Sequence, residues 1–331
     1  MKDLLNRLTN YESLSRDEAK NLLCRLISEN NNDSMIAAVL TSYIMRNITT
    51  DEILGFRDSM KEMSKQIDLS MYNTIDIVGT GGDHKNTFNI STLASFVVAG
   101  AGYHVAKHGN FGSTSVCGAS NVLEHLGVRF SSNEGLIQRS LDNSGIAYLH
   151  APLFNDGMKS VANVRKSLGI RTIFNILGPL LNPSEPDKLL LGTYNLEMAR
   201  LYAYICQQSG QDFLIVNSLD GYDEISLTAP FKVISIHREG IYNPADLGYE
   251  TYSQQSICGG QSIESSAKIF LSVLDNKATK AQKDCVCINA AFAIHLADPD
   301  KSLTEAMNIA EESLLSKKAL NAFRKFQQIN S

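Results

Sequence analysis

The segment at residues 75–92 constrains this chain more than any other part of it. It opens with a short β-branched run, Ile75–Val78, and passes through three glycines to Asp83. The polar cluster Asn89-Ile90-Ser91-Thr92 then precedes an apolar segment, Leu93–Ala101. This order predicts a strand, a glycine turn and the N-terminus of a helix. Such a turn suits a phosphorylated ligand, because glycines allow close approach and the free N–H groups point at the anion.

The glycine turn alone leaves two interpretations open. No Gly-Lys-Ser/Thr follows it and its spacing is not G-x-G-x-x-G, so it is neither a Walker A loop nor a dinucleotide fingerprint. A tight strand-to-helix turn without any ligand would look the same. The decision therefore depends on the motifs that follow along the chain.

Composition narrows the classes of protein that need to be considered. The chain has 331 residues, 44% hydrophobic and 20% charged, which is enough for a large core and two lobes. The net charge of −5 and the pI of about 5.8 argue against general affinity for nucleic acid or membrane surfaces. Met1–Arg7 lacks the apolar core of a signal peptide, and no continuous apolar stretch is long enough to span a bilayer. Six cysteines without a C-x-x-C pair fit a reducing, cytoplasmic location, and Cys285 and Cys287 are expected to be core residues.

The pattern of elements predicts an α/β fold with a small N-terminal helical lobe. Residues 1–68 contain only helical signals, including capping boxes at Ser15–Glu18 and Thr49–Glu52. Residues 69–164 and 186–331 alternate strands and helices, which indicates a larger lobe with a mostly parallel sheet. Residues 165–185, approximately, are expected to rejoin the helical lobe. Strands are expected at Ile75–Val78, His104–Lys107, Leu189–Gly192, Phe213–Asn217 and Val233–His237, and helices at Leu93–Gly100, Val122–Leu126, Met198–Gln208, Ser265–Leu274, Lys280–Leu296 and Leu303–Phe326.

Two polar motifs follow predicted strands. Lys107-His108-Gly109-Asn110 ends one strand, and Asp223-Glu224 lies in the loop after another. Ligands of open α/β sheets bind beyond the carboxyl ends of strands, so these motifs are expected to meet there. Lys107 could neutralise phosphate, and the acidic pair supplies hard oxygen ligands for Mg²⁺. The alternatives are a surface turn and a solvated acidic loop.

A fourth motif, at residues 161–171, contains Arg165. At helical spacing this arginine could reach a site and bind a carboxylate through its planar fork, or simply lie on a solvated face. Each motif is weak in isolation. Together they indicate chemistry on a phosphorylated substrate with a diphosphate-like leaving group.

With these motifs in this order, the chain closely resembles the anthranilate phosphoribosyltransferase family over nearly its whole length. The resemblance implies a helical lobe and an α/β lobe with the active site in the hinge cleft, and a homodimer formed through the helical lobes. The matching segments are Gly79–Asp83, Asn89–Thr92, Lys107–Asn110, Val122–Gly127, His150–Phe154, Val164–Pro183 and Asp223–Ser226.

The resemblance also implies a reaction and a role for each site residue. The amine of anthranilate would attack 5-phospho-α-D-ribose 1-diphosphate, releasing diphosphate with inversion, as the second step from chorismate to tryptophan. The donor would be held by Gly79, Gly82, Asp83, Thr87, Asn89, Ile90, Ser91, Thr92 and Lys107, and walled by Lys107, His108, Gly109, Asn110, Ser113, Thr114, Ser115 and Ala119. Mg²⁺ would be held by Ser91, Asp223 and Glu224, and anthranilate by Gly79, Asn110 and Arg165, with His108 and Pro179 lining its channel. Lys107, His108 and Asn110 act by charge and positioning, and no general base is assigned.

The chain departs from the family pattern at three places. Phe111 stands where the family usually has arginine, Ala119-Ser120-Asn121 replaces Ser-Ala-Asp, and Asn155-Asp156-Gly157 replaces His-Pro-Ala. These changes bear on acceptor affinity more than on the class of reaction. Three alternatives remain: a pyrimidine nucleoside phosphorylase on the same fold, a phosphoribosyltransferase with another aromatic amine acceptor, and a paralogue that binds nucleic acid.

Overall fold

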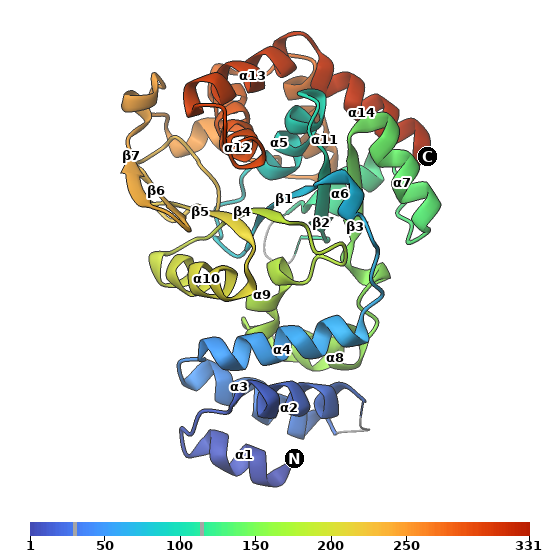
Figure 1. Ribbon diagram of the computed structural model, residues 1–331, viewed down its shortest axis with the longest axis vertical. Helices are drawn as coiled ribbons and strands as arrows, with labels where there is room; N and C mark the ends of the chain where they lie inside the picture. The colour runs from blue at the N-terminus through green and yellow to red at the C-terminus, as the bar shows by residue number, and fades with distance from the viewer. Residues whose placement is uncertain (29–31, 113–115) are drawn as a thin grey trace. The chain divides into compact units, whose positions relative to one another are not determined.

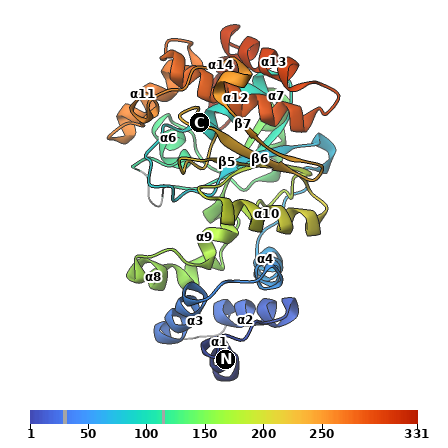
Figure 2. The same cartoon turned by 90° about the vertical axis from the view of Figure 1, so that its left-hand side faces the viewer.

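The computed structural model describes residues 1–28, 32–112 and 116–331. The chain forms two compact units, which Figures 1 and 2 trace along the sequence. Unit 1 comprises Met1–Ile67 and Ala151–Glu185, and unit 2 comprises Asp68–His150 and Pro186–Ser331. Among the described residues, no helix has the length and apolar character needed to cross a membrane.

Unit 1 is helical throughout the residues that are described. Both expected capping boxes form: Thr49 and Glu52 cap one helix, and Ser15 and Glu18 exchange bonds at the start of another. The sequence patterns place residues 151–164 in the α/β part, whereas here they belong to unit 1, because α8 packs on α2 and α3. The helices are α1 (Lys2–Thr9), α2 (Arg16–Ser28), α3 (Asp33–Met45), α4 (Thr50–Met63), α8 (Met158–Leu168) and α9 (Ile173–Leu177), with short 3₁₀ turns η2 (Ala151–Leu153) and η3 (Gly178–Leu180).

Unit 2 is built on one sheet of seven strands in the described residues, in the order β3-β2-β1-β4-β5-β6-β7. The first five strands are parallel, and β6 and β7 turn antiparallel at the far edge. The fold class is therefore the expected one. The strands are β1 (Ile75–Gly79), β2 (Val105–Gly109), β3 (Ile146–His150), β4 (Lys188–Gly192), β5 (Asp212–Ser218), β6 (Phe231–Ser235) and β7 (Glu239–Tyr242).

Helices cover both faces of this sheet. Figure 1 shows α5 and α12 on one face and α10 on the other, in agreement with their contacts. Helix α5 is almost wholly buried, as is the middle of α12, and the ring of Phe96 packs edge-on against three other phenylalanines. Cys285 and Cys287 are buried in α12, as expected for core residues. The helices are α5 (Ile90–Gly100), α6 (Ala119–His125), α7 (Glu134–Ser144), α10 (Leu196–Ser209), α11 (Ile263–Leu274), α12 (Lys280–Ala297), α13 (Leu303–Leu315) and α14 (Lys318–Ile329).

The structure differs from the expected elements in two ways. It adds α7, β3 and β7, which the sequence patterns do not predict; β7 is a short edge strand with exposed residues and so lacks an apolar run. The single helix expected over Leu303–Phe326 is broken into α13 and α14 at Lys317, which has a left-handed φ of 63°. The break lets α13 pack on α12 while α14 packs on α5 and α7.

Candidate active site

Three parallel strands end side by side in glycine. Gly79 at the end of β1 pairs in register with Gly192 at the end of β4, and β2 on the other side of β1 ends at Gly109. The glycine turn after β1 and the Lys107–Asn110 motif therefore lie at the same edge of the sheet, as their positions at strand ends predict. The acidic loop after β5, the next strand beyond β4, reaches the same edge.

Gly79 and Gly192 make room for Asp223. A Cβ atom at Gly79 would lie 2.4 Å from Asp223 Oδ2, and one at Gly192 would lie 1.6 Å from the Asp223 carbonyl oxygen. The acidic segment can cross these strand ends only because neither residue has a side chain. Gly192 is not among the site residues proposed from the sequence. Its only signal there is that it ends a predicted strand.

Backbone N–H groups hold the acidic pair in place. The N–H of Gly81 donates to Asp223 Oδ2 at 2.6 Å, and the N–H of Ser91 donates to Glu224 Oε1 at 2.8 Å. Gly81 and Gly82 both have positive φ, 69° and 79°, a conformation that favours glycine. Because Ser91 lies in the first turn of α5, Glu224 occupies the anion-binding end of that helix.

A residue on α12 fixes the segment that follows the acidic pair. The side chain of Asn289 accepts from the N–H of Ile225 at 3.1 Å and donates to the carbonyl of Ile225 at 2.8 Å. Asn289 is buried in the core of unit 2. Sequence reasoning missed this residue, since a lone asparagine inside an apolar helix carries no motif.

The acidic pair is electrostatically costly in the free protein. Burial raises the pKa of both carboxyl groups above their ordinary values, and the negative charge of Asp83 raises them further. The bond from Ser91 and the charge of Lys107 act in the opposite direction on Glu224. Concentrated negative charge of this kind favours binding of a cation.

Lys107 lies beneath the turn. Its side chain is buried, and Nζ donates to the carbonyl of Ile77 at 2.5 Å and to Ser91 Oγ at 3.5 Å. Burial lowers the pKa of Lys107, while three carboxylates, led by Asp76, raise it. The ammonium group thus links β1, α5 and β2 below the acidic pair.

The loop between the turn and α5 is fixed at several points. Asp83 Oδ1 accepts from the N–H of Lys85 at 3.1 Å, and Thr87 pairs with Cys258 in an antiparallel bridge. A Cβ at Gly259 would lie 2.7 Å from the Thr87 carbonyl oxygen, so this bridge also depends on a glycine. Asn89 Nδ2 donates to the carbonyl of Cys117 at 3.2 Å. Ile90 and Thr92 are buried in the first turn of α5.

The segment after β2 is held by its neighbours on α6. The carbonyl of Asn110 accepts from the N–H of Ser120 at 3.2 Å, next to Ala119, the first residue of α6. Asn121 Oδ1 accepts from the N–H groups of Gly112 and Gly118, both at 3.0 Å. The N–H of His108 donates to Asp76 Oδ1 at 3.2 Å. The expected donor residues Ser113, Thr114 and Ser115 lie outside the described residues.

The residues expected to bind the acceptor belong to different units. Gly79, His108 and Asn110 are in unit 2, whereas Arg165 and Pro179 are in unit 1. Arg165 lies on α8 with its guanidinium 5.1 Å from the ring centroid of Phe174, and burial lowers its pKa. No carboxylate within residues 1–28, 32–112 and 116–331 forms an ion pair with it. Pro179 is buried in η3.

The side chains at this edge supply some of the oxygen ligands that a metal ion needs, but too few to complete its coordination. No group of three or more His, Cys, Asp or Glu side chains suited to a metal occurs in the described parts of the chain. Asp223, Glu224 and the hydroxyl of Ser91 nevertheless form a hard oxygen set, and the buried Asp83 Oδ2 beside them has no hydrogen-bond partner there. This set fits Mg²⁺, which usually binds one or two carboxylates and takes its other ligands from substrate phosphates and water.

The comparisons with known proteins cover the whole chain. Residues 2–64 match the helical bundle domain of the Glycosyl transferase family, and residues 71–320 match its a/b domain. The anthranilate phosphoribosyltransferase of Phocaeicola vulgatus is 55% identical over 100% of both chains, and that of Flavobacterium johnsoniae is 51% identical over 100% of both.

Solved structures of similar proteins agree with this assignment. The Thermus thermophilus anthranilate phosphoribosyltransferase has a TM-score of 0.91 and 29% identity, covering 98% of each chain. The Saccharomyces cerevisiae enzyme in complex with PRPP and Mg has a TM-score of 0.91 and 29% identity, covering 98% of this chain and 96% of that one. On these similarities, the chain belongs to the anthranilate phosphoribosyltransferase family.

Proposed function

We propose that this chain catalyses transfer of the phosphoribosyl group of 5-phospho-α-D-ribose 1-diphosphate (PRPP) to anthranilate. The products are N-(5-phosphoribosyl)anthranilate and diphosphate, and the step belongs to tryptophan biosynthesis. The observation that carries the proposal is the paired anchoring of Asp223 by Gly81 and of Glu224 by Ser91 at one edge of the sheet. It joins a glycine turn, a helix N-terminus and an acidic pair, the buried Asp223 and the half-buried Glu224, which are the features that a diphosphate and its metal require.

The donor is assigned to unit 2. The glycine turn and the first turn of α5 would bind phosphate oxygens through N–H groups and the hydroxyls of Ser91 and Thr92, with Asp83, Thr87 and Asn89 contacting the ribose and diphosphate. Lys107 supplies a positive charge beside these residues. Gly109, Asn110 and Ala119 form part of the wall of the donor site. The bonds that fix this loop support the assignment, because a preorganised donor site loses little entropy on binding.

The metal is assigned to Ser91, Asp223 and Glu224, as Mg²⁺. Bound there with the donor, Mg²⁺ would supply positive charge to the departing diphosphate. The raised pKa of both carboxyl groups supports this assignment, because a divalent cation would offset both the cost of burying their charge and their repulsion from neighbouring carboxylates.

Anthranilate is assigned to Arg165, Asn110 and Gly79, with His108 and Pro179 beside it. Arg165 is the natural partner of the carboxylate, because its half-buried guanidinium lies over the ring of Phe174 and has no carboxylate partner among the described residues. The pKa of Arg165 is lowered by burial, so an anion would be bound in a site where charge is weakly screened.

The reaction itself asks little covalent chemistry of the protein. The amine nitrogen forms a bond to the anomeric carbon from the face opposite the diphosphate, the carbon–oxygen bond breaks, and the ammonium proton passes to solvent. The N–H donors of the turn stabilise charge on the leaving group, and Arg165 orients the acceptor. An aromatic amine is already neutral at pH 7, so no general base is assigned.

We also propose a homodimer formed through unit 1. Three large apolar side chains are exposed on the packed pair of helices α1 and α3. Tyr11 follows α1, and Ile44 and Met45 end α3, where Met45 is 67% exposed. Exposed large apolar side chains of this kind are common at subunit interfaces. Sedimentation of wild type and of Met45→Lys tests this: a dimer that dissociates in the variant supports it, and a monomeric wild type overturns it.

The test of the function uses the fluorescence of anthranilate. Purified protein, PRPP and Mg²⁺ are expected to make the signal fall only when all three are present, and EDTA is expected to keep it flat. A flat signal with the complete mixture would contradict the proposed acceptor. Phosphate-dependent release of uracil or thymine from a nucleoside, measured in parallel, would instead identify a nucleoside phosphorylase.

A further inference from the structure

A polar and aromatic cluster with a buried centre adjoins the Gly109–Asn110 turn. It consists of Ser120 on α6, Tyr148 and His150 on β3, and the rings of Phe111 and Phe130. We call these five residues the His150 brace. Phe111 and Ser120 stand at positions where the chain departs from the family motifs. None of the five is among the residues assigned above to substrate or metal.

Hydrogen bonds connect the brace to the turn. Ser120 Oγ lies 2.8 Å from the hydroxyl of Tyr148 and 2.9 Å from Nδ1 of His150, while the backbone N–H of Ser120 donates to the carbonyl of Asn110 at 3.2 Å. The same tyrosine hydroxyl faces Gly109 so closely that a Cβ there would lie 2.2 Å away. Ser120 and Tyr148 therefore contact both residues of the turn.

Aromatic contacts hold the next residue of the loop. The ring of Phe111 meets His150 edge-on at 4.9 Å, and His150 stacks on Phe130 at 4.4 Å with an interplanar angle of 23°. Both arrangements are favourable for aromatic pairs. Phe111 directly follows the Gly109–Asn110 turn. Although it is 41% exposed, its ring is thus in contact with β3.

The brace is neutral under ordinary conditions. Burial lowers the pKa of His150 to about 4, and burial raises the pKa of Tyr148 above its ordinary value. With both rings uncharged, the serine hydroxyl can donate to one partner and accept from the other. The network therefore fixes geometry and contributes no charge to the site.

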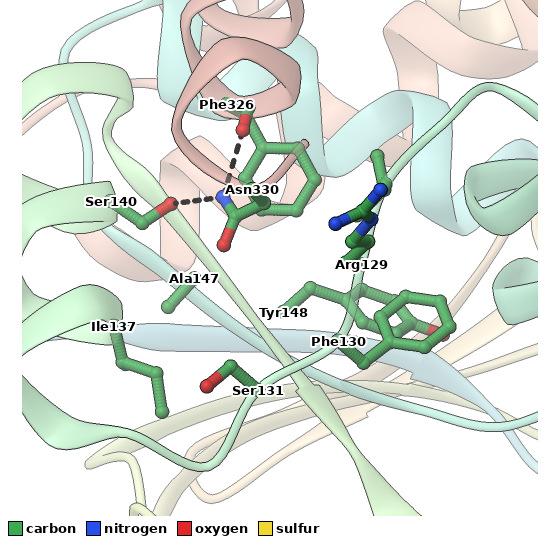
Figure 3. Close-up of a pocket in the computed structure, with 10 residues that line it drawn as sticks. Arg129, Phe130, Ser131, Ile137, Ser140, Ala147, Tyr148, Phe326 and Asn330 are labelled. Atoms are coloured by element: carbon green, nitrogen blue, oxygen red, sulfur yellow. Dashed lines mark hydrogen bonds between the residues drawn. The ribbon is translucent and has the colours of Figure 1, made fainter.

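A small cavity adjoins the brace. Its volume is about 10 Å³, and its lining includes Tyr148, Phe130, Ser140 and Asn330 (Figure 3). A space of this size is close to that of one water molecule.

We propose that the His150 brace is a positioning device for the acceptor, which holds the Gly109–Asn110 turn so that Asn110 meets anthranilate. The inference rests on the proposed function, in which Asn110 contacts the acceptor. The brace residues do not touch the substrate. Their removal is expected to displace Asn110 while leaving the donor-binding turn after β1 and the acidic pair in place.

The test compares conservative variants of the brace with a matched control. Tyr148→Phe and Ser120→Ala remove single hydroxyls, and Ser120→Thr keeps one. Tyr103→Phe is the control, because it removes a tyrosine hydroxyl bonded to Asp298 at 3.1 Å elsewhere in unit 2. For each variant, kcat, the KM values for anthranilate and PRPP, and the melting temperature are measured.

Both hydroxyl deletions are expected to raise the KM for anthranilate about tenfold, which corresponds to about 1.4 kcal/mol. The KM for PRPP is expected to rise by less than about threefold, because the glycine turn and the first turn of α5 still hold the donor phosphates when its wall at Gly109 and Asn110 shifts. Ser120→Thr is expected to recover most of the loss, and Tyr103→Phe to leave both KM values unchanged. Two results would overturn the positioning role of the brace and leave the proposed function standing. One is an unchanged KM for anthranilate in active variants. The other is a parallel change in both KM values and the melting temperature, which would indicate a general structural role. Absence of transfer by the wild type would overturn the proposed function and the brace with it.

Discussion

The substitution Gly192→Ala tests whether the two glycine strand ends position the acidic pair. The added Cβ would lie 1.6 Å from the carbonyl oxygen of Asp223, and the obstacle is backbone, which no side-chain rotation removes. Real Cβ contacts are essentially never under 3.0 Å, so β4 or the acidic segment must move by about 1.4 Å. The segment is also fixed by bonds to Gly81 and Ser91, which such a movement would stretch or break.

Two effects of that movement can be estimated. Overpacking of a well-packed site typically costs about 1–3 kcal/mol of stability. A displacement of about 1 Å in a catalytic constellation can cost roughly 100-fold in rate. Gly192→Ala is therefore expected to remain folded, with a lower melting temperature, and to lose at least about 100-fold in kcat/KM with a weakened response to Mg²⁺.

A matched control distinguishes the clash with the Asp223 carbonyl oxygen from the general effect of replacing a glycine by alanine in this sheet. Gly240 lies in β7, and a Cβ there would meet only a ring atom of Tyr242 at 3.8 Å, which is an ordinary contact. Gly240→Ala is expected to keep its activity. Gly79→Ala is intermediate, because its Cβ would meet the Asp223 carboxylate at 2.4 Å, and that group can rotate away only by losing its bond to Gly81.

The measurements are urea unfolding monitored by circular dichroism and the anthranilate fluorescence assay at several Mg²⁺ concentrations. If Gly192→Ala kept kcat/KM within about threefold of Gly240→Ala, the site would tolerate the displacement, and the argument that these glycines position the acidic pair would be refuted.

Four further predictions address single residues. Asp223→Asn is expected to lower turnover at least about 100-fold without lowering the melting temperature, because burial already raises the pKa of this carboxyl and its charged form is costly; a near-normal rate at limiting Mg²⁺ would contradict its role. Arg165→Ala should raise the KM for anthranilate about tenfold or more and leave that for PRPP unchanged, since a charge-assisted bond contributes about 1.5–3 kcal/mol. Glu52→Ala should lower the free energy of unfolding by about 3–5 kcal/mol, because it leaves the buried guanidinium of Arg46 without its carboxylate partner. The control is Glu62→Ala, which removes an exposed ion pair with Lys20 and should change the free energy of unfolding by less than about 1 kcal/mol. For His150, the folded pKa of about 4 lies below the unfolded value, so the unfolded chain binds more protons and stability should fall as pH decreases from about 6.5 to 4; His150→Phe should flatten that part of the urea-unfolding profile.

Much of the donor region could be predicted from local sequence. The glycine turn after Ile75–Val78 and the polar start of α5 form within one short segment, where strand, turn and helix signals do not depend on distant residues. The sequence also located the acidic loop and Lys107 at strand ends. The parallel order of β2, β1 and β4 then brings those ends together, as a parallel sheet must.

The missing parts share a physical cause, which is contact between residues distant in the chain. Gly192 matters because the Asp223 carbonyl passes over it, and Asn289 matters because it bonds Ile225 from another helix. The break at Lys317 likewise follows from packing against different neighbours. None of these residues has a local pattern that distinguishes it from an ordinary strand glycine or helix residue.

Taken together, the contacts of the acidic pair explain why its position needs so many supports. The buried Asp223 and the half-buried Glu224 repel each other and Asp83, and the positive charge of Lys107 opposes this at Glu224. The pair would move apart if nothing held it. The hydrogen bonds from Gly81 and Ser91 keep it in place, and the two strand-end glycines leave space for it there. Electrostatic strain retained in the free protein is released when a cation and an anionic donor bind, so it favours the loaded state over the empty one. The same reasoning predicts that Mg²⁺ with PRPP raises the melting temperature of the wild type more than that of Asp223→Asn, and equal shifts would show that the pair does not bind the cation.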